Sequence, residues 1–169
     1  AATRVNADGN IEKETQNLLL QSNSFDTTWE VSGASVAGGW AGYDGTNNAW
    51  LLSKSSGQYR RVYQNNATSG VYTLSVYAKA NTLSQVVLRD GASSMRARFD
   101  LSNGSLVDTS GSPISHSIVS VGNGWYRCSV TMLNSTQAQI GVDWSQSNAG
   151  SIYIQDAQLE QGLVARDYI

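Results

Sequence analysis

The sequence predicts an all-β protein, an antiparallel β-sandwich of the jelly-roll type with a short N-terminal arm or hairpin. Segments that alternate apolar and polar residues are separated by turn signals every 8–12 residues or so, about the spacing of sandwiches and barrels. No segment shows sustained helical periodicity. Ser, Thr, Asn, Gln and Gly also take the share of the composition that Glu, Lys, Ala and Leu would fill in a helical bundle.

The chain of 169 residues is long enough for one domain with a substantial core. We assign residues 17–169 to the jelly roll and residues 1–16 to the N-terminal arm or hairpin. Only Val5 and Ile11 are sizeable apolar residues in this arm, and the Asp-Gly pair at 8–9 is a hairpin turn signal. A hairpin this small is not stable alone. We therefore expect it to pack on the sandwich or on a neighbouring chain.

The clearest strand covers residues 124–132, directly after an Asn-Gly turn signal. Strict alternation places Trp125 and Arg127 on one face and Cys128 on the opposite, apolar face. We expect the apolar face to lie in the core and residues 161–169 to form a tail along the sheet edge. We also expect a first strand that begins at residue 17. The remaining expected strands cover residues 29–36 (a short pair), 50–53, 58–64, 71–80, 85–90, 95–101, 114–121, 137–144 and 151–160.

Residues 37–49 form the most irregular stretch, and their glycines predict a loop. This loop carries Trp40 and Tyr43, and Trp50 follows directly after it. Large aromatic side chains in a Gly-rich loop either cover the core or form a platform for a ligand. The sequence leaves both interpretations open for Trp40, Tyr43 and Trp125.

Several classes of function find no support in the composition. The net charge is −2 and no basic run occurs, so we expect no nucleic-acid partner. No apolar stretch approaches the roughly 18 residues of a membrane span, so we expect no membrane insertion. The single histidine, His116, and the single cysteine, Cys128, do not make a zinc site. No spacing demands a pair of catalytic carboxylates and no nucleophile motif is present, so we expect no enzyme activity.

Aromatic and arginine side chains recur on the polar faces of the expected strands, and this is the main functional signal. Flat aromatic rings pack against the C–H faces of sugar rings, while arginine donates hydrogen bonds to ring hydroxyls. Such a site is selective, because a ligand that lacks one partner leaves a buried polar group unpaired. The candidate ligand-binding residues are Trp40, Tyr43, Trp50, Tyr59, Arg61, Arg96, Arg98 and Trp125.

Several phrases of the sequence resemble a domain that is common in bacteriophage tail-fibre and spike proteins. The resemblance covers nearly the whole chain in the same order, including the lead-in ATRVNADGNIE and the final Tyr-Ile. Its other phrases are NLLLQS (17–22), YTLSVYAKA (72–80), RFDLSNG (98–104), VGNGWYRCSV (121–130) and IYIQDAQLEQG (152–162). That domain is similar to jelly-roll carbohydrate-binding modules, and its members usually sit in trimeric fibres that touch cell surfaces.

The resemblance implies a non-catalytic domain that binds cell-surface polysaccharide or another glycan as the receptor-recognition part of an adhesin. It implies a homotrimer through a parent fibre, located in a virion tail fibre or another surface-exposed fibre. Related modules often bind a structural calcium near the first and last strands, where Asp26 and Asp156 lie in the matching segments. No other cofactor is expected. Two alternatives stay open, a structural spacer or trimerisation module and, less favoured, a polysaccharide-degrading enzyme.

Overall fold

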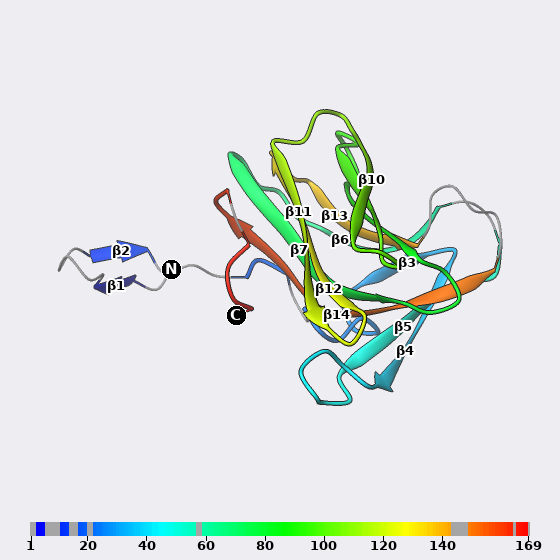
Figure 1. Ribbon diagram of the computed structural model, residues 1–169. Helices are drawn as coiled ribbons and strands as arrows, with labels where there is room; N and C mark the ends of the chain where they lie inside the picture. Colours follow the sequence, from blue (N-terminus) through cyan, green and yellow to red (C-terminus); the bar gives the residue numbers. More distant parts are fainter. Residues whose placement is uncertain are drawn as a thin grey trace.

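The computed structural model describes residues 3–5, 11–13, 17–19, 22–56, 59–142, 149–163 and 165–168. The regular secondary structure of these residues consists of β-strands alone. Twelve of the strands form two six-stranded antiparallel sheets that pack face to face (Figure 1). The predicted antiparallel β-sandwich is therefore confirmed. The described residues contain no helix that is long and apolar enough to cross a membrane.

The two sheets each contain six strands, and their outer faces carry different side chains. The first sheet, in spatial order, contains β10 (Ser105–Ser110), β9 (Arg96–Asp100), β8 (Gln85–Asp90), β13 (Gln137–Val142), β6 (Arg60–Asn65) and β3 (Glu30–Ser32). The second sheet contains β11 (Ser115–Gly122), β12 (Trp125–Leu133), β7 (Val71–Ala80), β14 (Gly150–Gln161), β5 (Ala49–Lys54) and β4 (Ala34–Trp40).

The core lies between the inner faces of the two sheets. In β9, Ala97 and Phe99 point inward and are fully buried, while in β12 the inward side chains include Cys128 and Val130. The alternation that predicted these strands thus also predicted their buried faces. Burial raises the pKa of the Cys128 thiol, so this cysteine behaves as a small apolar core residue. The core side chains without solvent exposure include Phe25, Leu52, Val62, Leu74, Val76, Val86, Leu88, Ile140, Ile152, Ile154 and Leu159.

The N-terminal residues follow the prediction in part. β1 (Thr3–Val5) pairs antiparallel with β2 (Ile11–Lys13), which gives the expected hairpin, and Figure 1 shows it apart from the two larger sheets. Residues 17–19 are not a strand, contrary to the prediction. The Asn17 side chain occupies the ladder positions instead, because it donates to Ala157 O at 3.0 Å and accepts from Leu159 N at 3.1 Å.

Two further segments differ from the sequence-based expectation. β4 extends through Trp40, so this tryptophan ends a strand and does not lie in a loop. β10 was not expected, because its polar residues alternate with few apolar ones. The last residues of the strand predicted over 137–144, including Trp144, lie outside the described residues.

The C-terminal residues cross a sheet face, although the sequence suggested a tail along the sheet edge. We call residues 162–163 and 165–168 the C-terminal strap. Its backbone carbonyl at Leu163 accepts from Thr131 Oγ1 at 3.2 Å, and its backbone N–H at Arg166 donates to Glu160 Oε1 at 2.5 Å. Thr131 and Glu160 both point outward from the second sheet and are almost fully buried. The strap follows this path because buried polar side chains require hydrogen-bond partners.

Candidate functional site

The outer face of the first sheet brings arginine and tyrosine side chains together. In β6, Arg61 and Tyr63 point outward because Val62 between them is buried in the core. The same alternation turns Arg96 and Arg98 outward in β9, on either side of Ala97. We call this surface the Arg–Tyr face, and it consists of Tyr59, Arg61, Tyr63, Arg89, Arg96 and Arg98.

Register across the first sheet sets the order of these side chains. Arg89 of β8 lies opposite Arg96 on one side and opposite Gln139 of β13 on the other. Gln139 in turn lies opposite Tyr63 of β6. Aligned neighbours in a sheet are within side-chain contact distance of each other. Arg96, Arg89, Gln139 and Tyr63 therefore form a continuous row across four strands.

Tyr59 lies at the centre of the Arg–Tyr face. Its hydroxyl donates to Gln139 Oε1 at 2.9 Å, and Arg89 Nη1 donates to the same oxygen at 3.1 Å. The guanidinium carbons of Arg61 and Arg89 lie 5.3 and 5.7 Å from its ring centroid. Burial raises the pKa of Tyr59 far above its usual value despite the nearby arginines, so its hydroxyl stays a neutral donor.

The ring of Tyr59 reaches this position because residue 141 is a glycine. A Cβ atom at Gly141 would lie 2.0 Å from Tyr59 Cε1, which is far inside van der Waals contact. No larger side chain at this position is compatible with the observed ring. Gly141 is therefore part of the construction of the Arg–Tyr face, although it has no side chain of its own.

Acidic residues partly balance the charge of this face. Asp108 Oδ1 accepts from Arg96 Nη1 at 2.9 Å and from Arg98 Nε at 2.7 Å, and Asp108 Oδ2 accepts from Arg98 Nη2. These hydrogen bonds, that from Arg98 first, hold the pKa of Asp108 below its usual value. Tyr63 donates to Glu30 Oε2 at 2.9 Å. Among the residues that the structure describes, four arginines and two acids lie on this face, so the described part of the surface carries more positive than negative charge.

The outer face of the second sheet carries a different group of rings. Tyr43 and Tyr77 stack with centroids 3.6 Å apart and planes at 7°, and Trp125 meets Tyr43 edge-on at 6.1 Å. Tyr153 lies 6.5 Å from Trp125 and 5.6 Å from Trp40. We call these five residues the aromatic cluster.

Mutual packing removes most ring faces of this cluster from solvent. Trp125 is only 2% exposed, whereas Trp40 at the rim is 41% exposed. Of the two interpretations that the sequence left open for Trp125, the structure favours the covered ring, because neighbouring rings pack over it. The Tyr43 hydroxyl donates to Asp156 Oδ2 at 2.7 Å, and burial, followed by this hydrogen bond, raises the pKa of Tyr43.

Trp50 is also not an exposed platform. Its ring meets the fully buried Phe25 edge-on at 6.2 Å, and its Nε1 donates to Asn23 O at 2.8 Å. These contacts pack it against the core. The predicted ligand-binding residues thus divide into three sets in the structure. The Arg–Tyr face holds Tyr59, Arg61, Arg96 and Arg98, the aromatic cluster holds Trp40, Tyr43 and Trp125, and the edge of the core holds Trp50.

Sequence reasoning missed Arg89, Gln139, Tyr77 and Tyr153. A signal for Tyr77 and Tyr153 was present, because each is the outward residue beside an inward Val or Ile in a strand that had been predicted. Arg89 follows the same rule in β8, where Leu88 before it is buried. Gln139 carried no such signal, since glutamine is common on any polar strand face.

The two candidate calcium ligands do not fit a calcium site. Asp156 accepts the Tyr43 hydroxyl, and burial raises its pKa, which disfavours the charged form that a cation needs. Asp26 is exposed and accepts from Thr27 Oγ1 at 3.2 Å. Calcium takes about six to eight oxygen ligands. Within the described residues, no three His, Cys, Asp or Glu side chains gather in one place.

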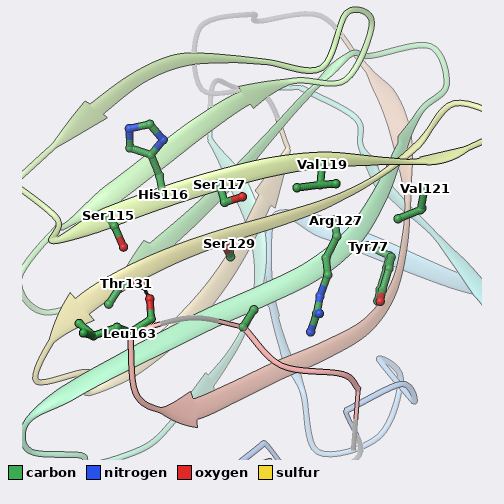
Figure 2. Close-up of a pocket in the computed structure, with 11 residues that line it drawn as sticks. Tyr77, Ser115, His116, Ser117, Val119, Val121, Arg127, Ser129, Thr131 and Leu163 are labelled. Atoms are coloured by element: carbon green, nitrogen blue, oxygen red, sulfur yellow. Dashed lines mark hydrogen bonds between the residues drawn. The ribbon is translucent and has the colours of Figure 1, made fainter.

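A groove of about 450 Å³ lies on the outer face of the second sheet, between β11 and the C-terminal strap (Figure 2). Tyr77 belongs both to this groove and to the aromatic cluster. The remaining lining residues come from β11, β12 and the strap. The second sheet therefore offers a hollow next to its rings, whereas the first sheet offers an open row of cations and rings.

Comparison with known proteins gives the fold a name. No family model and no curated protein sequence matches this chain. Among solved structures, a mutant of a carbohydrate binding module of family 29 has a TM-score of 0.51 at 11% identity, covering 88% of this chain and 92% of that chain. The module TmCBM61 in complex with beta-1,4-galactotriose has a TM-score of 0.50 at 12% identity, covering 85% and 97%. The fold is that of a carbohydrate-binding-module jelly roll.

A third similar structure is the enzymatically active domain of tailspike protein 4 of bacteriophage CBA120. It has 17% identity and a TM-score of 0.49, and the match covers 88% of this chain but 21% of the tailspike chain. This chain therefore spans about a fifth of that protein's length. At identities this low, the likenesses to the two carbohydrate-binding modules concern the fold alone.

Proposed function

We propose that this chain is a non-catalytic carbohydrate-binding domain and that the Arg–Tyr face is its glycan-binding surface. The observation that carries the proposal is the position of Tyr59 among Arg61, Arg89 and Arg96 on one sheet face. A ring held by a hydrogen bond to Gln139 supplies a fixed apolar surface. Arginine N–H groups around it supply donors for sugar hydroxyls. The jelly-roll fold shared with carbohydrate-binding modules supports the same class of function.

The larger context belongs to the proposal as well. We infer that the domain recognises cell-surface polysaccharide as part of a surface-exposed fibre, such as a tail-fibre adhesin, in a homotrimeric parent protein. The sequence phrases shared with tail-fibre domains support this inference. The chemistry of the Arg–Tyr face supports binding without catalysis, because Asp108 is engaged by two arginines and Glu30 by Tyr63. A general acid or base must be available for proton transfer.

The test is titration of the full chain with a panel of bacterial surface polysaccharides, measured by calorimetry or on a glycan array. We expect Tyr59→Ala and Arg61→Gln each to weaken binding at least tenfold, about 1.4 kcal/mol. Arg60→Gln is the matched control, since Arg60 precedes Arg61 in β6 and donates to Ser56 O instead. It should change affinity less than about twofold.

The same titration distinguishes the two sheet faces. Trp40→Ala removes the most exposed ring of the aromatic cluster and should leave this affinity unchanged. Loss of binding in Trp40→Ala, with none in Tyr59→Ala, would place the site on the second sheet. Absence of binding to every polysaccharide tested would refute the proposal altogether.

A structural role in a fibre is a second candidate, and the N-terminal hairpin favours it. Strands of three residues, such as β1 and β2, do not form a stable pair in isolation. A neighbouring copy could supply the surface that stabilises them. Light scattering of the full chain tests this candidate: a trimer at micromolar concentration supports it, and a monomer at high concentration removes it.

A further inference from the structure

The groove between β11 and the C-terminal strap has the size of a small-molecule site. Its volume of about 450 Å³ lies within the range of ligand pockets, about 300–1,000 Å³. Three strands and the strap enclose it, so its walls are largely formed by regular structure (Figure 2). The lining side chains used below are Arg127, Ser115, Ser117, Ser129, Val119, Val121 and Leu163.

Arg127 provides the groove with a cation that has few partners. Its guanidinium carbon lies 5.4 Å from the Tyr77 ring centroid, and its Nη2 donates to Arg166 O in the strap. Its Nε is buried and donates to no residue in the described part of the chain. Arg127 forms no ion pair with any residue that the structure describes. A guanidinium has five N–H donors and a positive charge. Because Arg127 is partly buried and uses few of these donors, an anion is the ligand that would pair with it best.

Hydroxyl groups lie beside this cation in register. Ser117 of β11 lies opposite Ser129 of β12, and Val119 lies opposite Arg127, so all four side chains share one face. The hydroxyls of Ser115, Ser117 and Ser129 make no hydrogen bond to a described residue. Figure 2 shows His116 pointing away from Ser115 and Ser117, as alternation along β11 requires. The groove thus presents unengaged donors and acceptors next to a positive charge.

Apolar side chains complete the rim. Val119 is 57% exposed, Val121 is 42% exposed and Leu163 is 61% exposed. Three exposed aliphatic residues around one hollow are more than the scattered single apolar residues of an ordinary surface. They favour a ligand that has an apolar group as well as an anionic one.

We propose that this groove is a second saccharide site, which takes an acidic sugar residue bearing an acylamino group. Its carboxylate would pair with Arg127, its hydroxyls with the serines of β11 and β12, and its methyl group would pack on Val119 and Val121. The inference extends the proposed glycan-binding function, and it rests on that function only for the class of ligand. The residues of the two sites do not overlap.

Three sugars separate the contributions of charge and apolar surface. N-acetylneuraminic acid carries both a carboxylate and an acetamido group, glucuronic acid carries only the carboxylate, and N-acetylglucosamine carries only the acetamido group. Amide shifts of the isotope-labelled full chain are followed in each titration. We expect each sugar to shift amides of β11 and β12, with N-acetylneuraminic acid binding most tightly, then glucuronic acid, then N-acetylglucosamine. The affinity for the two acids should fall as the salt concentration rises.

Val119→Asp tests the role of the cation without deleting any groove donor. The new carboxylate lies opposite Arg127 and neutralises it, at a position that is mostly exposed and so tolerates the change. Ser120→Asp is the matched control, because it adds the same charge to the neighbouring residue on the opposite face of β11. We expect affinity for N-acetylneuraminic acid to fall at least tenfold in Val119→Asp and to stay within about twofold in Ser120→Asp.

The amide spectrum also shows whether each variant is folded and which face responds. Shifts on β6, β8 and β9 report the Arg–Tyr face, so failure of one site is distinguishable from failure of the other. The groove proposal is overturned if neither acid shifts β11 or β12 at high concentration. It is equally overturned if Val119→Asp and Ser120→Asp, both folded, bind the acid as the unmodified chain does.

Discussion

Gly141 gives the sharpest test of how the Arg–Tyr face is built. In Gly141→Ala, the added methyl group would lie 2.0 Å from Tyr59 Cε1 and 2.7 Å from Cζ. Carbon atoms approach each other to about 3.5 Å, so the ring must move by roughly 1.5 Å. A shift of this size breaks the 2.9 Å hydrogen bond from Tyr59 to Gln139. It also moves the ring away from Arg61 and Arg89.

The expected free-energy change follows from those lost contacts. The hydrogen bond contributes about 1 kcal/mol, and each arginine–ring contact about 0.5–1 kcal/mol. Replacing glycine by alanine within a strand returns about 0.5–1 kcal/mol. The net loss of unfolding free energy is therefore about 1–2.5 kcal/mol, which corresponds to a fall in Tm of about 3–8 °C for a domain of this size.

Urea unfolding of a double-mutant cycle measures this coupling. In the Tyr59→Ala background there is no ring to displace, so adding Gly141→Ala should be neutral or slightly stabilising. The interaction energy between the two positions should be about 2 kcal/mol. Glycan affinity should fall in Gly141→Ala alone as it does in Tyr59→Ala. Equal destabilisation by Gly141→Ala in both backgrounds would show that the glycine is needed for another reason.

Two buried carboxylates predict opposite pH dependences. Burial alone would raise the pKa of Asp90, but hydrogen bonds from Ser93 and from backbone N–H groups outweigh it, so the pKa lies below its usual value. The contribution of Asp90 to stability is therefore present above about pH 4 and is lost as the pH falls through the folded pKa. Asp90→Asn should cost about 1–3 kcal/mol in urea unfolding at pH 7 and progressively less as the pH falls below about 4, and a cost independent of pH would contradict this reasoning. Burial raises the pKa of Asp156, so its contribution is present below about pH 4 and lost as the pH rises through the folded pKa. Asp156→Asn, at a φ of 51° that asparagine tolerates, should therefore be neutral or stabilising at pH 7, and a loss above about 1 kcal/mol in the same assay would refute this.

The strand pattern was predictable because the core selects it locally. In β9 and β12, each inward residue is apolar, and each outward residue except the terminal Leu133 is polar or aromatic, so period-two alternation identifies both the strand and its buried face. The same rule gave the outward direction of Arg61, Arg96 and Arg98. What alternation cannot give is the order of strands across a sheet. β6, β8 and β13 are distant in sequence, and only their pairing brings Arg89 and Gln139 to Tyr59.

Trp125 shows why outward does not mean exposed. Alternation placed its side chain on the outer face correctly, yet Tyr43 and Tyr153 cover it there. Tyr43 comes from a loop whose path no strand pattern describes. The C-terminal strap is a similar case, since its position depends on a hydrogen bond that Thr131 donates and one that Glu160 accepts, and both residues look like ordinary surface side chains in the sequence. Coverage of a sheet face by distant segments is thus the part that the sequence did not reveal.

The two proposed surfaces lie on opposite outer faces of the sandwich, and this geometry limits how one glycan could use both. Packed sheets are about 10 Å apart, and side chains on each outer face add further distance. A single sugar residue therefore contacts one face only, so the two sites should respond independently to monosaccharides. A polysaccharide that satisfies both chemistries would instead link two copies of the domain, or wrap around one, with avidity set by the length of chain between the bound residues. Val119→Asp should then abolish cross-linking by an acidic polysaccharide while leaving one-to-one binding through the Arg–Tyr face intact.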